Sequence, residues 1–298
     1  NFIYYILNNI IIGIIPLVSL SILSRELKPE DYGLYALYLI VGSTFSSFIN
    51  FGLPAAHEVM FFEQKSKFLQ KKLTFSSITF ILLLSVIVFI PLYFAKDVII
   101  DTVIYDTNRN NILYLAYWSC IISSLTVLFF NHLRNEGNGR DFLIYKSISS
   151  FVNLFLTLFL ILRLGYNFEA FFIATIITSL SVMIFFTVKL KLEINSVSIP
   201  LIKEMIVIAL PLFPKMILGF LRTNYDRILI NNISTQSILG TYDIGLKVSN
   251  QGYTIMNSLY NSYLPDFYKI LNEKPVGYKE KVPNFLLKFF TVYILSLL

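Results

Sequence analysis

Six charged side chains lie within or at the edges of apolar stretches that otherwise have the composition of membrane helices: Lys215, Arg222, Asp226, Arg227, Asp243 and Lys247. A charge is costly in hydrocarbon, so such residues usually face a bundle interior or a wet cavity. Arg222 and Asp226 are four residues apart and Lys215 lies seven before Arg222, so one helix face carries all three. Asp243 and Lys247 repeat the four-residue spacing. Because four of the six charges are positive, a cavity that they line would favour an anionic ligand.

These residues and one further cation make up the candidate site. The predicted substrate-binding residues are Lys215, Arg222, Asp226, Lys247 and Arg25, and the predicted structural or coupling ion pairs involve Asp243 and Arg227. Structural alternatives stay open at three places. Arg222 and Asp226 suit a salt bridge that only locks the helix to a neighbour. Arg227 and Arg25, near the outer ends of their spans, suit contact with lipid headgroups.

Other polar and aromatic residues are expected to have ordinary roles. His57 follows the second apolar stretch and is predicted to be a solvated loop residue. Tyr residues near the ends of apolar stretches, such as Tyr32 and Tyr35, are predicted to form interfacial belts. Asp97, Asp101 and Asp106 form a short acidic loop that we expect to be solvated rather than to bind a metal. The single cysteine, Cys120, excludes a disulfide framework, and no cofactor site is predicted.

The composition requires a membrane environment. Hydrophobic residues are 56% of the 298, charged residues are 14%, and the mean hydropathy is +0.68. A soluble chain of this size could not bury that much apolar surface. The net charge of +6 does not indicate nucleic acid, because a basic excess on cytoplasmic loops gives the same sum.

Stretches long enough to cross a bilayer recur along the chain, since a spanning helix needs about 20 apolar residues. The nine predicted spans are residues 2–23, 32–53, 73–95, 112–133, 142–162, 168–188, 202–230, 241–264 and 284 onward. The loops after the even-numbered spans hold 13 Lys and Arg, and the other loops hold five. Positive charge stays on the cytoplasmic side, which predicts a cytoplasmic N-terminus. Pro211 and Pro214 predict a bent or broken seventh span.

An internal repeat relates the second span to the eighth. The second span carries Gly33 near its start and Leu53-Pro54 at its end, while the eighth carries Gly240 and Leu264-Pro265. The glycines are 207 residues apart and the Leu-Pro pairs 211. An offset of six spans leaves both copies facing the same way, as in two parallel lobes. We therefore predict an all-α, two-lobed bundle, with a six-helix lobe at residues 1–200 and the start of a second, incomplete lobe at 201–298.

Short motifs in a fixed order resemble those of the polysaccharide-export flippases, the bacterial translocases of O-antigen and capsule repeat units. They are Leu23-Ser24-Arg25, Pro29-Glu30-Asp31-Tyr32-Gly33-Leu34-Tyr35, Phe51-Gly52-Leu53, Leu133-Arg134 with Gly139-Arg140, Ala209-Leu210-Pro211-Leu212, Tyr225-Asp226-Arg227 and Gly240-Thr241-Tyr242. That family is similar to the multidrug and toxic-compound exporters and to the lipid II flippases. The resemblance implies two six-helix lobes around a central cavity, and it implies that the last helices of the second lobe lie beyond this chain.

Three functions compete for this sequence. The leading one is translocation of a polyprenyl-pyrophosphate-linked oligosaccharide across the bacterial cytoplasmic membrane, by alternating access and without an enzyme activity. The expected partners are that lipid-linked glycan, membrane lipid and other polysaccharide-assembly proteins. A cation-coupled multidrug exporter of the same fold is the second, although its chemistry favours acidic cavity residues. A membrane glycan polymerase or glycosyltransferase is the third, and it would need a catalytic carboxylate at the interface.

Overall fold

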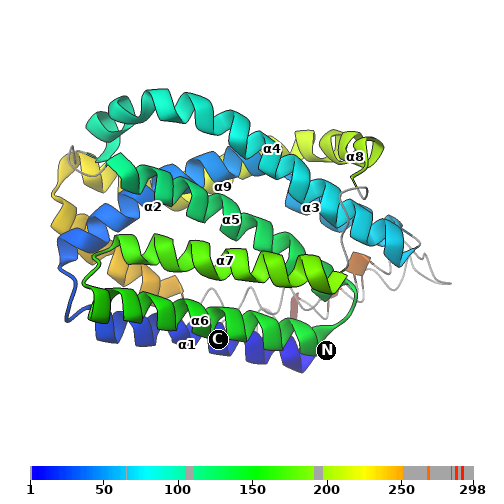
Figure 1. Ribbon diagram of the computed structural model, residues 1–298, viewed down its shortest axis with the longest axis horizontal. Coiled ribbons are helices and arrows are strands. Elements are labelled where there is room, and N and C mark those ends of the chain that lie inside the picture. The colour runs from blue at the N-terminus through cyan, green and yellow to red at the C-terminus, as the bar shows by residue number, and fades with distance from the viewer. Residues whose placement is uncertain are drawn as a thin grey trace.

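The computed structural model describes residues 2–64, 66–104, 110–190 and 197–250, with seven further residues towards the C-terminus. Within these ranges every regular element is helical (Figure 1). The elements are α1 Phe2–Leu23, α2 Pro29–Asn50, α3 Leu53–Glu63, α4 Lys67–Ile99, η1 Ile100–Ile104, α5 Asn110–Asn135, α6 Gly139–Leu164, α7 Glu169–Leu190, α8 Ile199–Ala209, η3 Leu210–Leu212 and α9 Phe213–Ile233. Residues 236–250 form one more helix.

The spans predicted from hydropathy are present. Six helical segments of the described chain are long and apolar enough to cross a membrane, and α1 adds the apolar stretch Ile11–Leu23. Together they account for the first seven predicted spans. The described part of the eighth is the helix of residues 236–250, and residues 251–264 and most of the ninth span lie outside the described residues. The chain is therefore an all-α, multi-pass membrane protein.

The second span differs from the prediction because it contains two helices. α2 ends at Asn50, where Phe51 and Gly52 both adopt positive φ angles of 48° and 78°. α3 then starts at Leu53, with Pro54 in its first turn, and continues to Glu63. The left-handed pair turns the chain without a polar loop, so hydropathy alone places the end of this span ten residues too early.

The seventh span is broken where its prolines predicted a break. α8 ends at Ala209, the turn η3 covers Leu210–Leu212, and α9 begins at Phe213. Pro211 has no backbone N–H to donate to the preceding turn, so the α-helical hydrogen-bond pattern is interrupted there.

The two ends of the helix bundle differ in charge. The connections before α4 and before α6 lie at one end, beside Lys67, Lys71, Lys72 and Arg140, and we call this the basic end. The connections before α2, before α7 and after α9 lie at the opposite end (Figure 1). Hydrogen bonds at this end link the connection before α7 to α2, from Asn167 to the Asp31 carboxylate at 2.7 Å, and the helix of residues 236–250 to η1, from Gln236 to the Ile104 carbonyl at 3.2 Å.

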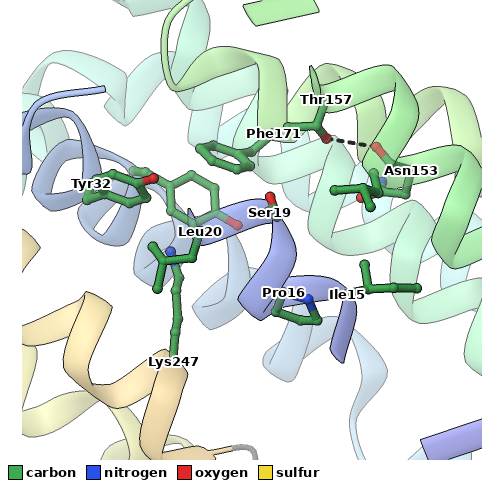
Figure 2. Close-up of a pocket in the computed structure, with 11 residues that line it drawn as sticks. Ile15, Pro16, Ser19, Leu20, Tyr32, Asn153, Thr157, Phe171 and Lys247 are labelled. Atoms are coloured by element: carbon green, nitrogen blue, oxygen red, sulfur yellow. Dashed lines mark hydrogen bonds between the residues drawn. The ribbon is translucent and has the colours of Figure 1, made fainter. Parts of the chain in front are cut away.

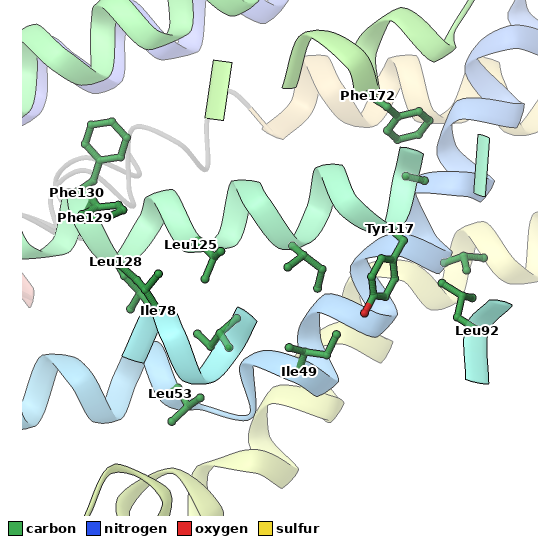
Figure 3. Packing of buried hydrophobic residues seen from close by; sticks show 14 of the residues in the cluster. Ile49, Leu53, Ile78, Leu92, Tyr117, Leu125, Leu128, Phe129, Phe130 and Phe172 are labelled. Carbon is green, nitrogen blue, oxygen red and sulfur yellow. The ribbon is translucent and has the colours of Figure 1, made fainter. Parts of the chain in front are cut away.

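The main apolar core lies between α2, α4 and α5. Leu125, Leu128 and Phe129 of α5 pack with Ile78 of α4 and Ile49 of α2 (Figure 3). α2 and α5 approach closely at Gly42, where an added Cβ would lie 2.6 Å from the carbonyl oxygen of Ala116. A glycine is required at this position because the two backbones leave no space for a side chain.

The repeat-related glycines meet at the opposite end. A Cβ added at Gly33 would lie 2.9 Å from the carbonyl carbon of Gln236, and one added at Gly240 would lie 2.8 Å from that of Pro29. Both contacts join residues whose separation in sequence is close to that of the predicted repeat. We call this contact the glycine crossing. It holds α2 against the helix of residues 236–250.

Candidate functional site

A cavity of about 180 Å³ lies near the opposite end, between α1, α2, α6, α7 and the helix of residues 236–250 (Figure 2). Lys247 is the charged residue of its lining, and Tyr32, Tyr35 and Phe171 provide aromatic walls. The rest of the lining comes from Ile15, Pro16, Ser19, Leu20, Asn153, Leu154 and Thr157. We call it the Lys247 pocket.

The ammonium group of Lys247 points into a cage of three rings. Its Nζ atom lies 5.1 Å from the ring centre of Tyr32, 4.7 Å from that of Tyr35 and 5.8 Å from that of Phe171. All three distances are within the range of about 6 Å in which a ring face attracts a cation. The cage fixes the position of the charge at the wall of the cavity.

A buried carboxylate anchors Lys247 from behind. Asp243, which is 1% exposed, contacts Lys247 Nζ at 3.0 Å and Arg227 Nη2 at 2.8 Å. Arg227 also donates to the side chain of Asn224 at 3.1 Å. Asp243 and Lys247 thus form the ion pair that their four-residue spacing predicts. The alternative that Arg227 contacts lipid headgroups is wrong, because its guanidinium is paired inside the protein.

Asp226 is bonded differently from either sequence-based expectation. Its carboxylate accepts a hydrogen bond from the Tyr242 hydroxyl and a second from the backbone N–H of Arg227. Within the described part of the chain no ion pair joins it to Arg222. Among those residues neither Arg222 nor Asp226 forms the salt bridge to a neighbouring helix that was the structural alternative, and Asp226 is linked to the next helix by the Tyr242 hydroxyl.

Four of the five predicted substrate-binding residues are absent from the lining of the Lys247 pocket: Asp226, Lys215, Arg222 and Arg25. Lys215 and Arg222 are exposed on α9, two turns apart on one face, and Arg25 is exposed in the connection between α1 and α2. Arg227, Asp243 and Lys247 together carry one surplus positive charge at the pocket. The positive charge that the sequence predicts is thus divided between the Lys247 pocket and the open face of α9.

The aromatic cage was missed by sequence reasoning. Tyr32 and Tyr35 are not members of an interfacial belt, since both line the cavity and the Tyr32 side chain is buried. Their three-residue spacing placed both on one helix face, and that was the available signal. Phe171 had no such signal, because it comes from α7.

A second cavity adjoins the first. It has a volume of about 400 Å³, lies between α2, α5 and α7, and shares Tyr35 with the Lys247 pocket. Its lining is rich in hydroxyls: Ser43, Ser46, Ser47, Ser119, Ser123, Ser124 and Thr175. Several of these, such as Ser43, Ser119 and Thr175, donate to carbonyls of their own helices, which leaves oxygen lone pairs able to accept hydrogen bonds. We call it the hydroxyl cleft.

Polar residues predicted to be in loops are buried at the basic end. His57 is 0% exposed within α3, so the prediction of a solvated loop residue is wrong. Arg134, counted among the loop cations, is buried at the end of α5 and forms an ion pair with Glu58 of α3. Both errors follow from ending the second span at Leu53, because α3 then packs where a loop was expected. Among the described residues, no cluster of three or more His, Cys, Asp or Glu side chains suits a metal ion.

Comparisons with known proteins identify the fold and the family. The chain resembles the MATE multidrug transporter DinF-BH (TM-score 0.77, 16% identity, 98% of this chain and 69% of that one). It also resembles MATE in complex with MaD3S, with a TM-score of 0.67 and 13% identity over 99% of this chain and 70% of that one. A third similar structure is the bent form of the Vibrio cholerae MATE transporter VcmN, with a TM-score of 0.59 and 12% identity over 98% of this chain and 68% of that one. A comparison with curated protein sequences gives no match.

Because these sequence identities are low, the structural likeness shows the fold alone. The family is shown by the match of the sequence to a family model. The model of the family described as "Polysaccharide biosynthesis protein" matches residues 1–270. This range includes the motifs, the glycine crossing and the Lys247 pocket. The chain therefore belongs to the polysaccharide biosynthesis protein family, on a scaffold that is also that of the MATE transporters.

Proposed function

We propose that this protein translocates a polyprenyl-pyrophosphate-linked oligosaccharide across the bacterial cytoplasmic membrane. The family match supports a role in polysaccharide assembly, and the fold supports export. The observation that carries the proposal is the Lys247 ammonium, held by Asp243 and three rings at the wall of a cavity inside the helix bundle. A fixed cation in such a place suits the oxygens of a phosphate.

The two adjoining cavities suit two parts of one ligand. The Lys247 pocket offers a positive charge to the pyrophosphate. The hydroxyl cleft offers hydrogen-bond acceptors to sugar hydroxyls, and Tyr35 lines both cavities. The polyprenyl chain stays in the bilayer, because moving this apolar chain into water would be costly.

Alternating access provides the movement. The glycine crossing holds α2 against the helix of residues 236–250 at the opposite end, and in our proposal translocation separates these two helices there. With an inside-negative potential, each negative charge moved outward gains about 2.3 kcal/mol per 100 mV. A pyrophosphate can therefore be driven outward by the potential itself.

The test exchanges Lys247 for Gln and reconstitutes the protein in vesicles with a fluorescent polyprenyl-pyrophosphate trisaccharide. Loss of one charge-assisted hydrogen bond should slow translocation at least about tenfold. Lys247→Gln leaves Asp243 paired with Arg227, so the buried carboxylate keeps a counter-ion. Lys203→Gln, on an exposed position of α8, is the matched control. Equal rates for the two variants would contradict the proposed site.

Multidrug export is the second candidate, because the MATE structures share the fold and the Lys247 pocket is walled by aromatic rings. The same vesicles loaded with a cationic dye distinguish the two functions. Dye efflux that survives in the absence of any glycan translocation would replace the first proposal with the second.

A further inference from the structure

A chain of buried polar groups at the basic end takes no part in the proposed translocation site. His57 of α3, Thr74 of α4 and His132 of α5 are each 0% exposed. The Thr74 hydroxyl oxygen is 2.8 Å from His57 Nε2 and 2.8 Å from His132 Nδ1. It is also 3.1 Å from the carbonyl oxygen of Gln70, one turn earlier in α4. On the far side of His132, its Nε2 lies 3.8 Å from a carboxylate oxygen of Glu136.

The hydrogen count at Thr74 allows two arrangements. A threonine hydroxyl has a single hydrogen but can accept two hydrogen bonds. In the first arrangement Thr74 donates to His132 Nδ1 and accepts from His57 Nε2, and His132 is neutral with its proton on Nε2. In the second, Thr74 donates to the Gln70 carbonyl and accepts from both rings, so His132 carries protons on both nitrogens. These tautomers are assigned from the hydrogen-bond partners.

The two arrangements differ by one proton, and no heavy atom has to move between them. Rotation of the Thr74 hydroxyl from His132 to the Gln70 carbonyl is sufficient. In both, the Nε2–H of His132 makes no hydrogen bond within the described part of the chain, but the Glu136 carboxylate 3.8 Å away stabilises the positive charge of a doubly protonated ring.

His57 is not suited to the same change. Its Nδ1 is buried and has no hydrogen-bond partner among the described residues. A proton placed there would be a buried donor with no ion-pair partner among those residues, whereas Nε2 of His132 lies 3.8 Å from the Glu136 carboxylate. A second charged ring on the same hydroxyl would also repel His132.

The surrounding charges leave Glu136 as the counter-ion. Glu136 lies in the connection between α5 and α6, and its pKa is lowered chiefly by its interaction with His132 and further by Lys67 and Lys71. Glu58 is already paired with Arg134. Of the other packed elements, α2 brings no charged side chain to this end, and α6 begins with the exposed Arg140.

The remaining charged groups nearby are directed elsewhere. Lys189 of α7 is paired with Asp141 of α6 at 2.8 Å. Lys203 and Glu204 of α8 are exposed. None of the four replaces Glu136 beside the His132 ring in the described structure.

We propose that His132 is a proton-binding site, with Glu136 as its counter-ion and Thr74 as the hydroxyl that changes acceptor when the proton binds. The site adjoins the contact between α4 and the α8 segment. Ser76 and Ser77, directly after this part of α4, contact Ser198 and Met205 of that segment at 2.9 and 3.0 Å. Proton uptake is thus placed beside the contact that holds α8. The proposal does not depend on which substrate the protein carries.

Nitrogen NMR of the ¹⁵N-histidine-labelled protein in lipid nanodiscs tests this directly. The chain contains two histidines, so two sets of ring signals are expected, and a His57→Gln variant assigns them. As the pH is lowered, His132 should change from one protonated nitrogen to two. His57 should keep a neutral ring with its proton on Nε2.

Variants identify the counter-ion and the switching hydroxyl. Glu136→Gln should move the His132 transition down by about one pH unit, an approximately tenfold loss of proton affinity. Glu63→Gln, at the exposed end of α3, should not move it. Thr74→Val should also lower the pH at which His132 gains its second proton, and Thr74→Ser should restore that pH to its value in the unaltered protein. A His132 ring that stays neutral throughout, two rings that titrate together, or equal effects of Glu136→Gln and Glu63→Gln would overturn the proposal.

Discussion

Replacing a glycine of the glycine crossing by alanine should force α2 away from the helix of residues 236–250. A Cβ at Gly240 would overlap the carbonyl oxygen of Pro29, and it would lie 2.8 Å from both the carbonyl carbon of Pro29 and the backbone nitrogen of Gly33. Carbon atoms in contact are ordinarily about 3.5–4.0 Å apart, so the backbones must separate by about 1 Å. The atoms that block the methyl group belong to the main chain, and no side-chain rotation relieves the overlap.

The expected cost is that of overpacking, about 1–3 kcal/mol. For a chain of this size each kcal/mol lowers the Tm by about 2–4 °C, so Gly240→Ala should lower it by several degrees. Gly33→Ala should have a similar effect, because its Cβ would lie 2.9 Å from the carbonyl carbon of Gln236. The double variant should cost less than the two single costs together, since the first methyl group already separates the helices.

Thermal unfolding in detergent and hydrogen exchange over residues 29–40 and 236–247 measure the effect. Gly245→Ala is the matched control, because Gly245 lies in the same helix and its Cβ would meet nothing within 4 Å. Alanine in a helix interior is favoured over glycine by about 0.5–1 kcal/mol, so this variant should be neutral or stabilised. If Gly240→Ala matched Gly245→Ala in both measurements, the steric argument would be refuted.

Three further results are expected. Glu58→Ala should destabilise the fold by about 3–5 kcal/mol in chemical unfolding, because it removes the carboxylate of the buried pair with Arg134; a loss below about 1 kcal/mol would contradict this. The lowered pKa of Glu136 contributes stability above its unfolded pKa, which is lost as the pH falls through the folded value, so Glu136→Gln should flatten the acid side of the stability profile. Lys215 and Arg222 lie on the open face of α9 and outside the Lys247 pocket, so charge reversal at either should reduce glycan export less than Lys247→Gln does, and a larger loss of surface polysaccharide in such cells would contradict the proposed site.

The candidate site was predictable where its signal was local. The ion pair of Asp243 and Lys247 follows from a four-residue spacing in one helix, and that spacing is the same in any helix that contains it. The partner of Arg227 was not predictable in this way, because Asp243 comes from a different helix and only the packing of the two brings them to 2.8 Å. The aromatic cage of Lys247 likewise combines side chains from α2 and α7.

The fold was likewise predictable only where it depends on a signal in adjacent residues. Apolar length and proline positions predicted the first seven spans and the break between α8 and α9, because each depends on residues adjacent in sequence. The turn at Phe51 and Gly52 was not predicted, since a left-handed pair leaves no trace in hydropathy. Because this turn was not predicted, His57 was expected in a loop and not in α3.

By itself, the amino-acid sequence determined that the chain lies in a membrane and the order of its first seven spans, because the cost of placing polar groups in hydrocarbon acts on each segment separately. The tertiary structure determined which charges meet. It buried His57, His132 and the pair of Glu58 with Arg134, it enclosed Lys247 in rings, and it left Lys215 and Arg222 on an open face. A side chain's surroundings depend on helices distant in sequence, and no local pattern specifies how those helices pack.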